Sequence, residues 1–184
     1  MKRSFDVIIS LIAIPLFIPF LLPILVVAWF QTKKFPIFIQ ERGLSLTNSR
    51  IKIFKIRTMK KSPVKVEDLN SIFIKENTAY HVSSFGKFLR KTGIDEFPQF
   101  FNVLKGEMSI FGPRPLMISD LELIKQNDPK IYELRNTLKS KPGISGSWQL
   151  FGNRENGLTD LIKYDLLYDS LKSFSYDSKL FFLT

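Results

Sequence analysis

The feature that most restricts the fold is a run of 24 residues, Val7 to Phe30, that contains no charged side chain. As a straight helix the run would measure about 36 Å, which is enough to cross a hydrocarbon core of about 30 Å. Three prolines, Pro15, Pro19 and Pro23, each remove a backbone donor from it, so we predict a bend or break near its middle. The run therefore predicts a membrane helix.

Basic residues flank this run on both sides. Lys2-Arg3 precede it and Lys33-Lys34 follow it. Because Lys and Arg favour the cytoplasmic side of a membrane, both ends are drawn to one face, and we predict a re-entrant helix that dips in and returns. An ordinary spanning anchor is an alternative, since spanning helices tolerate proline. A cleaved signal peptide fits less well, because its apolar region would be about 7 to 15 residues long and end in small residues.

Composition restricts the chemistry of the remaining chain. The first 34 residues hold four basic residues and one acid, so residues 35–184 carry +7 of the formal net charge of +10, and we expect a negatively charged partner. A hydrophobic content of 45%, with 18 Phe, excludes a disordered basic tail. The absence of cysteine excludes a disulfide scaffold and a thiolate site, and the single histidine, His81, excludes a multi-His metal centre. A metal would have to be bound by carboxylates or substrate phosphates.

Local patterns predict a predominantly α-helical fold with one small β-hairpin, an α+β class. The apolar runs Ile37–Ile39 and Ile51–Ile56 read as the two strands. Residues 60–70 are mostly polar and are predicted to form a surface excursion with no assigned role, and residues 72–74 fit either core or membrane. Helical periodicity follows from Ser84 and stops at Thr92-Gly93.

The last segment, residues 158–183, also has apolar positions at helical spacing. We expect its first half to pack in the core. Its Phe-rich end, with Phe181-Phe182, fits an amphipathic helix seated at a membrane interface.

A pair of acids marks the start of a predicted helix over residues 95–105. Asp95 and Glu96 begin it, Pro98 lies in its first turn, and an aromatic face follows. Carboxylates at a helix N-terminus are stabilised by about 0.3 to 1 kcal/mol, and proline costs little there. Taken alone, this pattern favours acidic capping of a helix over catalysis.

A stiff turn follows, in which Arg114 lies between Pro113 and Pro115. The prolines fix the backbone, and a guanidinium presented in this way suits bidentate recognition of phosphate. A solvated arginine in a proline-rich turn explains the pattern equally well. A second rigid turn, Lys141–Gly146, has glycines that would let a ligand approach the backbone, although a plain connection fits it as well.

Taken together, these patterns resemble the small monotopic phosphoglycosyl transferases, the bacterial sugar transferase family that starts lipid-linked glycan assembly. The resemblance spans nearly the whole chain, and the block from Asp95 to Pro115 is its most specific part. The matching residues are Lys2-Arg3, Phe5-Asp6, Gln40-Glu41-Arg42, Lys55 to Met59, Phe88-Leu89-Arg90, Asp95-Glu96, Pro98-Gln99, Phe101 to Lys105, Gly112 to Pro115, Pro142-Gly143-Ile144, Trp148-Gln149 and Tyr164-Asp165 through Tyr168.

The resemblance implies a reaction. A sugar 1-phosphate would pass from a UDP-sugar to polyprenyl (undecaprenyl) phosphate with release of UMP, by a ping-pong route with Mg²⁺. Asp95 would be the nucleophile that forms a phosphosugar-aspartyl intermediate, and Glu96 its partner or proton acceptor. Asp95 would also be the first candidate to bind Mg²⁺, with Glu96 second. The candidates for holding the two phosphates are Lys55, Arg57, Arg90 and Arg114.

The resemblance also implies a location. Polyprenyl phosphate keeps its tail in the bilayer and its phosphate at the surface, so we predict residues 1–34 to be the re-entrant membrane helix. Residues 35–184 would form an interfacial catalytic domain on the cytoplasmic face of the bacterial inner membrane. Downstream glycosyltransferases and a homodimer are compatible with this prediction, and no nucleic-acid partner is expected.

The chain departs from the family pattern in three places. Ile18-Pro19 replaces the usual Ser-Pro pair of the membrane helix, and Lys141 stands where Arg is usual. Arg154 is displaced by one residue, which leaves open whether it reaches a phosphate.

Two other functions fit parts of the sequence. A catalytically silent, membrane-anchored basic module could bind anionic lipid or nucleic acid, but it has no need of an Asp-Glu pair beside a Pro-Arg-Pro turn. A polytopic transferase of the same reaction type would need several apolar spans, and the sequence has one. Neither the sugar nor the glycan pathway follows from these residues.

Overall fold

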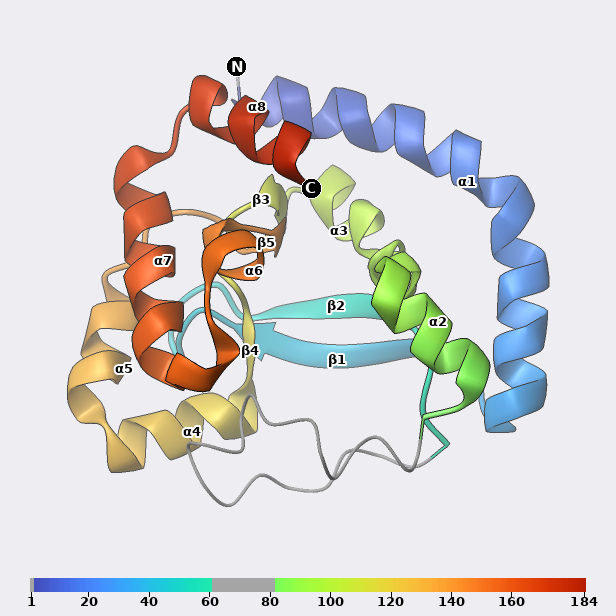
Figure 1. Cartoon of the computed structure of the whole chain (residues 1–184), viewed down its shortest axis with the longest axis horizontal. Coiled ribbons are helices and arrows are strands. Elements are labelled where there is room, and N and C mark those ends of the chain that lie inside the picture. Colours follow the sequence, from blue (N-terminus) through green and yellow to red (C-terminus); the bar gives the residue numbers. More distant parts are fainter. Residues whose placement is uncertain (1, 61–81) are drawn as a thin grey trace.

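The structure is a computed structural model that describes residues 2–60 and 82–184, and within them the chain is mostly helical with two small sheets (Figure 1). The predictions for residues 61–70 and 72–74 lie outside the described residues. In chain order the elements are α1 (Lys2–Thr32), β1 (Ile37–Gly43), β2 (Ile51–Ile56), α2 (Ser84–Thr92), the 3₁₀ turn η3 (Ile94–Glu96), α3 (Gln99–Lys105), β3 (Ser109–Phe111), β4 (Leu116–Met117), α4 (Ile118–Asn127), α5 (Pro129–Asn136), β5 (Gly143–Ser145), α6 (Ser147–Phe151), η4 (Arg154–Asn156), α7 (Gly157–Leu171) and α8 (Phe174–Leu183).

The long apolar helix α1 bends around the outside of the other elements (Figure 1). The predicted bend is confirmed, but no break occurs, because the helix continues through Pro15, Pro19 and Pro23. Among the described residues it is the one helix long and apolar enough to cross a membrane. Only 11% of its most apolar window is buried, so α1 is not the core helix of the domain. Its return to the same membrane face stays a prediction.

The first turns of α1 are bound to the body of the protein by polar contacts. The buried Asp6 carboxylate accepts hydrogen bonds from Ser109 Oγ at 2.8 Å and from the Ile110 amide at 3.1 Å. Arg3 donates to two carbonyls at the C-terminal end of α3, at 2.5 and 2.9 Å, where the helix dipole favours a cation. This end of the apolar helix is therefore part of the folded domain.

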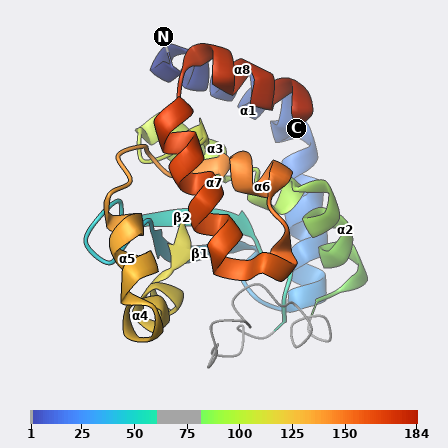
Figure 2. The same cartoon turned by 60° about the vertical axis from the view of Figure 1, so that its left-hand side comes forward.

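Lys2 extends this attachment to the last two helices. Its Nζ donates to Tyr168 Oη of α7 at 2.8 Å and to the Phe111 carbonyl of β3 at 3.1 Å, and it forms an ion pair with the buried Asp177 of α8. Figures 1 and 2 show α8 lying beside the first half of α1. Polar groups of β3, α7 and α8 thus meet at one lysine of α1.

The predicted hairpin is confirmed. Strands β1 and β2 pair in antiparallel register, with Ile37 opposite Ile56 and Arg42 opposite Ile51. The two-residue strand β4 extends the sheet on the other side of β1, which gives the order β2-β1-β4. β4 was not predicted, because two residues show no strand periodicity.

The second sheet joins the turn before Arg114 to the turn after Lys141. Strands β3 and β5 run parallel, and the Gly112 amide donates to the Ser145 carbonyl at 3.0 Å. A Cβ on Gly143 would lie only 2.2 Å from the Gly112 nitrogen. The glycines of the second turn therefore allow two backbones to approach each other, and this explains them without the ligand contact that the sequence left open.

Within residues 2–60 and 82–184, three apolar clusters hold the fold together. One lies between β2, α3, β3, α7 and α8, a second lies between α4, α5, α6 and α7, and the third packs α1 against β2 and α2. The expected core role of α7 is confirmed by the burial of Leu161 and Tyr168. In α8, Leu180 is buried whereas Phe182 is 86% exposed, so its Phe-rich end keeps the amphipathic character predicted for it. Its seat at a membrane interface stays a prediction.

The predicted helix over residues 95–105 was wrong at its start. Ile94–Glu96 form a 3₁₀ turn, and α3 begins only at Gln99. The backbone here bonds three residues back, as in the contacts of Glu96 N with Gly93 O (3.0 Å) and Phe97 N with Ile94 O (3.1 Å). Pro98 has no N–H with which to bond four residues back, so the α-helix cannot extend through it. The two acids therefore precede the helix and do not lie in its first turn.

Candidate active site

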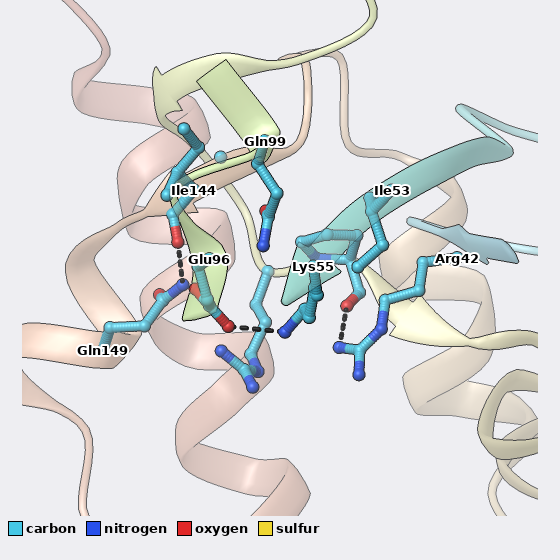
Figure 3. Close-up of a pocket in the computed structure, with 10 residues that line it drawn as sticks. Arg42, Ile53, Lys55, Glu96, Gln99, Ile144 and Gln149 are labelled. Atoms are coloured by element: carbon cyan, nitrogen blue, oxygen red, sulfur yellow. Dashed lines mark hydrogen bonds and ion pairs between the residues drawn. The ribbon is translucent and has the colours of Figure 1, made fainter. Parts of the chain in front are cut away.

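Segments far apart in the sequence meet around a small pocket beside Glu96 (Figure 3). They are β1, β2, the turn η3, the start of α3, the loop before β4, the strand β5 and the helix α6. The residues that line the pocket are Arg42, Ile53, Lys55, Glu96, Gln99, Arg114, Pro115, Gly143, Ile144 and Gln149. Three of the sequence-predicted site residues, Lys55, Glu96 and Arg114, are therefore brought together.

Asp95 and Glu96 occupy different electrostatic environments although they are neighbours. Asp95 is 8% exposed, and this burial raises its pKa to about 6 although Lys55 and Arg90 favour its charged form. Burial acts in the same direction on Glu96, but the charges of Lys55, Arg114 and Arg42 outweigh it and lower the pKa of Glu96 below its usual value. Glu96 is thus the permanent anion of the pair, and Asp95 is the acid that titrates nearer to neutrality.

Lys55 is the direct partner of Glu96. Its Nζ lies 2.5 Å from Glu96 Oε1, as Figure 3 shows. Burial, together with the positive charges of Arg42 and Arg114, lowers the pKa of Lys55 to about 8 against the attraction of Glu96. Negative charge on a bound ligand would favour the protonated, positively charged form of this lysine.

Arg114 is held in place through its backbone. Its amide donates to Asp165 Oδ1 at 3.1 Å, and its carbonyl accepts from Arg135 Nη2 at 2.8 Å. The guanidinium lies over the Trp148 ring, 5.2 Å from its centroid. The flanking prolines and this double clamp together fix the arginine at the pocket, as the sequence led us to expect for a rigid turn.

Arg42 is a pocket residue that the site prediction missed. Its guanidinium donates to Gln40 Oε1 at 3.0 Å and to the Pro115 carbonyl at 3.2 Å. Burial and the nearby Arg114 lower its pKa to about 10, against the attraction of Glu96. The signal that could have found it is the register of the hairpin, since residues directly opposite each other share a face.

The sequence pattern predicted only the first three residues of β1 as a strand, so the residue opposite Arg42 could not be predicted. In the structure Arg42 lies opposite Ile51 and Phe38 lies opposite Lys55. Positions two apart on a strand point to the same side, which places Arg42 and Lys55 on one face.

The other two predicted arginines lie apart from the pocket lining. Arg90 donates to Thr58 Oγ1 at 2.8 Å and influences the site through its charge on Asp95. Arg57 donates to the Phe35 carbonyl at 2.8 Å and lies over the Phe38 ring. The structure does not bring Arg57 into the pocket, and its contact with phosphate stays a prediction.

Within residues 2–60 and 82–184, no three carboxylate or histidine side chains gather as a metal site. The donors beside the pocket are the carboxylates of Asp95 and Glu96, and Glu96 is already paired with Lys55. One or two carboxylates with substrate phosphates and waters are the usual ligands of Mg²⁺. The residues present therefore fit Mg²⁺ that arrives with a phosphate substrate.

The whole chain matches one family model. Residues 1–184 fit the model described as bacterial sugar transferase, and the chain belongs to this family. The resemblance noted in the sequence is thereby confirmed.

Individual relatives carry more specific names. The UDP-glucose:undecaprenyl-phosphate glucose-1-phosphate transferase of Klebsiella pneumoniae is 37% identical over 190 residues, which cover 100% of this chain and 39% of that protein. The exopolysaccharide production protein ExoY of Sinorhizobium fredii is 32% identical over 91% of this chain and 76% of its own length. An N-acetylgalactosaminephosphotransferase of Aeromonas hydrophila, which acts on undecaprenyl phosphate, is 34% identical over 95% of this chain and 40% of its own. The chain thus spans about two fifths of two of these relatives.

Proposed function

We propose that this protein transfers a sugar 1-phosphate from a UDP-sugar to undecaprenyl phosphate and releases UMP. The names of its relatives support this donor and acceptor. The observation that carries the proposal is the setting of Glu96, which lies in a pocket with three cations, Arg42, Lys55 and Arg114, directly after the buried Asp95. Phosphoryl transfer depends mainly on positioning and on neutralising charge, and this pocket offers both.

In the first step, an Asp95 carboxylate oxygen attacks the β-phosphorus of the UDP-sugar. The new O–P bond gives a phosphosugar-aspartyl intermediate, and the bond between the β-phosphorus and the bridging oxygen breaks, so that UMP leaves with that oxygen. With a pKa of about 6, Asp95 is mostly ionised at pH 7 to 8. It therefore needs no separate base to become a nucleophile.

In the second step, a phosphate oxygen of undecaprenyl phosphate attacks the same phosphorus and frees Asp95. The product is a lipid diphosphate that carries the sugar. Glu96 fits a positioning role in both steps better than proton transfer, because its pKa is lowered and its carboxylate holds Lys55. Arg42, Lys55 and Arg114 bind the phosphate oxygens and stabilise the charge that develops on them.

Asp95 would hold Mg²⁺, with Glu96 as a second ligand and the substrate phosphates completing the set. When bound, Mg²⁺ neutralises part of the phosphate charge.

The apolar helix supports a site at a membrane surface. The Phe17 ring of α1 stacks on the Phe97 ring with centroids 3.9 Å apart, and Phe97 directly follows Glu96. The outer face of α1 remains apolar and exposed, for example at Leu16 (73%). We infer that this face lies in lipid and that the turn carrying Asp95 and Glu96 lies at its surface, on the cytoplasmic side of the inner membrane.

The proposal is tested with the full chain in lipid nanodiscs. UDP-glucose, UDP-galactose or UDP-N-acetylgalactosamine is added with Mg²⁺ and no lipid acceptor. We expect one of them to release UMP in an amount equal to the protein and to add one sugar phosphate to Asp95, detected by mass spectrometry. Undecaprenyl phosphate should then remove the adduct.

The matched control is Asp95→Asn, which fits the same space but has no nucleophilic carboxylate. It should release no UMP and keep its place in the nanodisc. Release of UMP by this variant would remove Asp95 from the proposed role. Tight vesicle binding by the wild-type chain, without UMP release from any of the three donors, would favour the silent basic module instead.

A further inference from the structure

Gln149 brings an unusual polar atom to the pocket. It lies on α6, and its side-chain amide faces Glu96 and Ile144 in Figure 3. The Nε2 group donates to the Ile144 carbonyl at 3.4 Å, which sets the orientation of the amide. Its Oε1 is buried and has no hydrogen-bond partner within the described part of the chain. Buried carbonyl oxygens are nearly always paired, so this one points to a donor from a bound molecule.

The three cationic side chains of the pocket have the opposite character. Arg42, Lys55 and Arg114 are donors only, and they suit the oxygens of a diphosphate. Those oxygens are ionised at neutral pH and carry no hydrogen, so they cannot donate to Gln149 Oε1. Within a bound UDP-sugar, the partner of this oxygen must therefore be an O–H or N–H group outside the diphosphate.

We infer that Gln149 recognises the organic part of the donor substrate, accepting at Oε1 a hydrogen bond from a hydroxyl of the sugar or from an O–H or N–H of the uridine. This inference rests on the proposed function, because it takes the pocket to be the UDP-sugar site. It assigns to Gln149 a contact that the cations cannot make.

The surrounding backbone fixes Gln149 relative to Arg114. The Gly112 amide, at the start of the Arg114 turn, donates to the Ser145 carbonyl at 3.0 Å just before α6. A Cβ on Gly146 would lie 2.2 Å from the Gly112 carbonyl oxygen and 3.3 Å from Gln149 Oε1, so the turn, the loop and the amide are in close contact. The phosphate-binding arginine and the orphan acceptor therefore form one rigid unit.

Trp148, the residue before Gln149, strengthens this link because its ring lies against the Arg114 guanidinium, 5.2 Å from ring centroid to Cζ. Adjacent residues of α6 thus serve adjacent parts of a ligand. One supports the group that binds phosphate, and the next presents an acceptor beside it.

The test uses the full chain in nanodiscs with Mg²⁺ and the variant Gln149→Met, which keeps the length of the side chain and removes the strong acceptor. Binding is measured by titration calorimetry with inorganic pyrophosphate, UDP and UDP-glucose, or with UDP-N-acetylgalactosamine if the wild type turns over only that sugar nucleotide. We expect pyrophosphate binding to be unchanged and UDP-sugar binding to weaken roughly tenfold, the usual effect of one lost hydrogen bond.

The three probes separate the two sources of the donor group. If Gln149→Met weakens the binding of UDP as much as the binding of the UDP-sugar, the hydrogen bond comes from uridine. If only the binding of the UDP-sugar weakens, the hydrogen bond comes from the sugar. The same change at an exposed position, Gln126→Met on α4, should alter none of the three affinities.

Two results would overturn the inference. One is an unchanged affinity of Gln149→Met for UDP and for the UDP-sugar. The other is an equal loss for all three probes, which would mean that Gln149 acts through the phosphate site. Either result counts against the inference only if the wild type releases UMP. A wild type that neither binds UDP nor releases UMP would contradict the proposed function itself.

Discussion

Arg135 and Asp165 form a buried ion pair, with Nη1 and Oδ2 2.8 Å apart, behind the backbone of Arg114. Their side chains are 0% and 2% exposed. Arg135 comes from α5 and Asp165 from α7, and each also bonds one end of the Arg114 peptide unit. The pair thus joins two helices to the turn that carries Arg114, the side chain proposed to bind phosphate.

Removing one member of this pair should be costly. We expect Asp165→Ala to lower the free energy of unfolding by about 3 to 5 kcal/mol, because it leaves Arg135 buried without its counter-ion. Chemical denaturation of the protein in detergent measures the change. The exposed pair of Glu41 and Arg50, 2.8 Å apart, gives the control, since Glu41→Gln should cost at most about 1 kcal/mol. If the two variants lost the same free energy of unfolding, the buried Arg135-Asp165 pair would not be the stabilising contact described above.

Replacing Arg114 by lysine should weaken the handling of the UDP-sugar. An ammonium cannot bind two phosphate oxygens as a planar fork does, and it loses the contact with the Trp148 ring. We expect Arg114→Lys to lower kcat/KM for UMP release about tenfold or more while leaving the melting temperature near that of the wild type. Unchanged kinetics would make Arg114 a structural residue only.

The pKa values of Asp95 and Lys55 predict the pH dependence of UMP release in the absence of the lipid acceptor. Asp95 must be ionised to attack, so kcat/KM should fall as the pH drops below about 6. Lys55 must be charged to bind phosphate, so kcat/KM should also fall as the pH rises above about 8.

The variant Lys55→Arg tests the assignment of the alkaline limb. A guanidinium keeps its charge to higher pH than an ammonium, and in this pocket the pKa of Arg42 is about 10, so the upper limb should move to higher pH while the lower limb stays in place. An alkaline limb that remained near pH 8 in this variant would belong to another group.

Asp6 should matter for stability although it lies at the start of the apolar helix. Asp6→Ala leaves the Ser109 hydroxyl and the Ile110 amide without their buried partner, which should cost about 1 to 3 kcal/mol for each unpaired group. The melting temperature and UMP release should both fall, whereas sedimentation with vesicles should not change. Ile12→Ala, at a side chain that is 63% exposed, should leave the melting temperature unaffected.

Local signals predicted the parts of the fold that depend on neighbouring residues. The hairpin, the stop of α2 at Gly93 and the rigid turn at Arg114 all follow from short patterns, and Gly93 indeed takes the left-handed conformation, with φ of 73°. The Asp95-Glu96 pair was also found, although Pro98 shifted the start of the helix behind it.

The features that the sequence did not predict depend on contacts between residues far apart in the chain. The pairing of β3 with β5 joins Ser109 to Gly143, and no local pattern encodes that contact. Arg42 was missed for the same reason, since only the hairpin register places it beside Lys55. The Arg135 clamp on Arg114 needs two helices, α5 and α7, and a loop in their final positions, so a linear pattern could not reveal it.

The attachment of α1 through Lys2, Arg3 and Asp6 has a practical consequence for anyone who wants this enzyme in water. Deleting the first helix to gain solubility would also delete the groups that cap α3 and pair with Ile110 and Asp177. A water-soluble variant should instead retain the opening turns and carry polar substitutions at outward positions further along, where nothing in the body of the protein relies on the side chain.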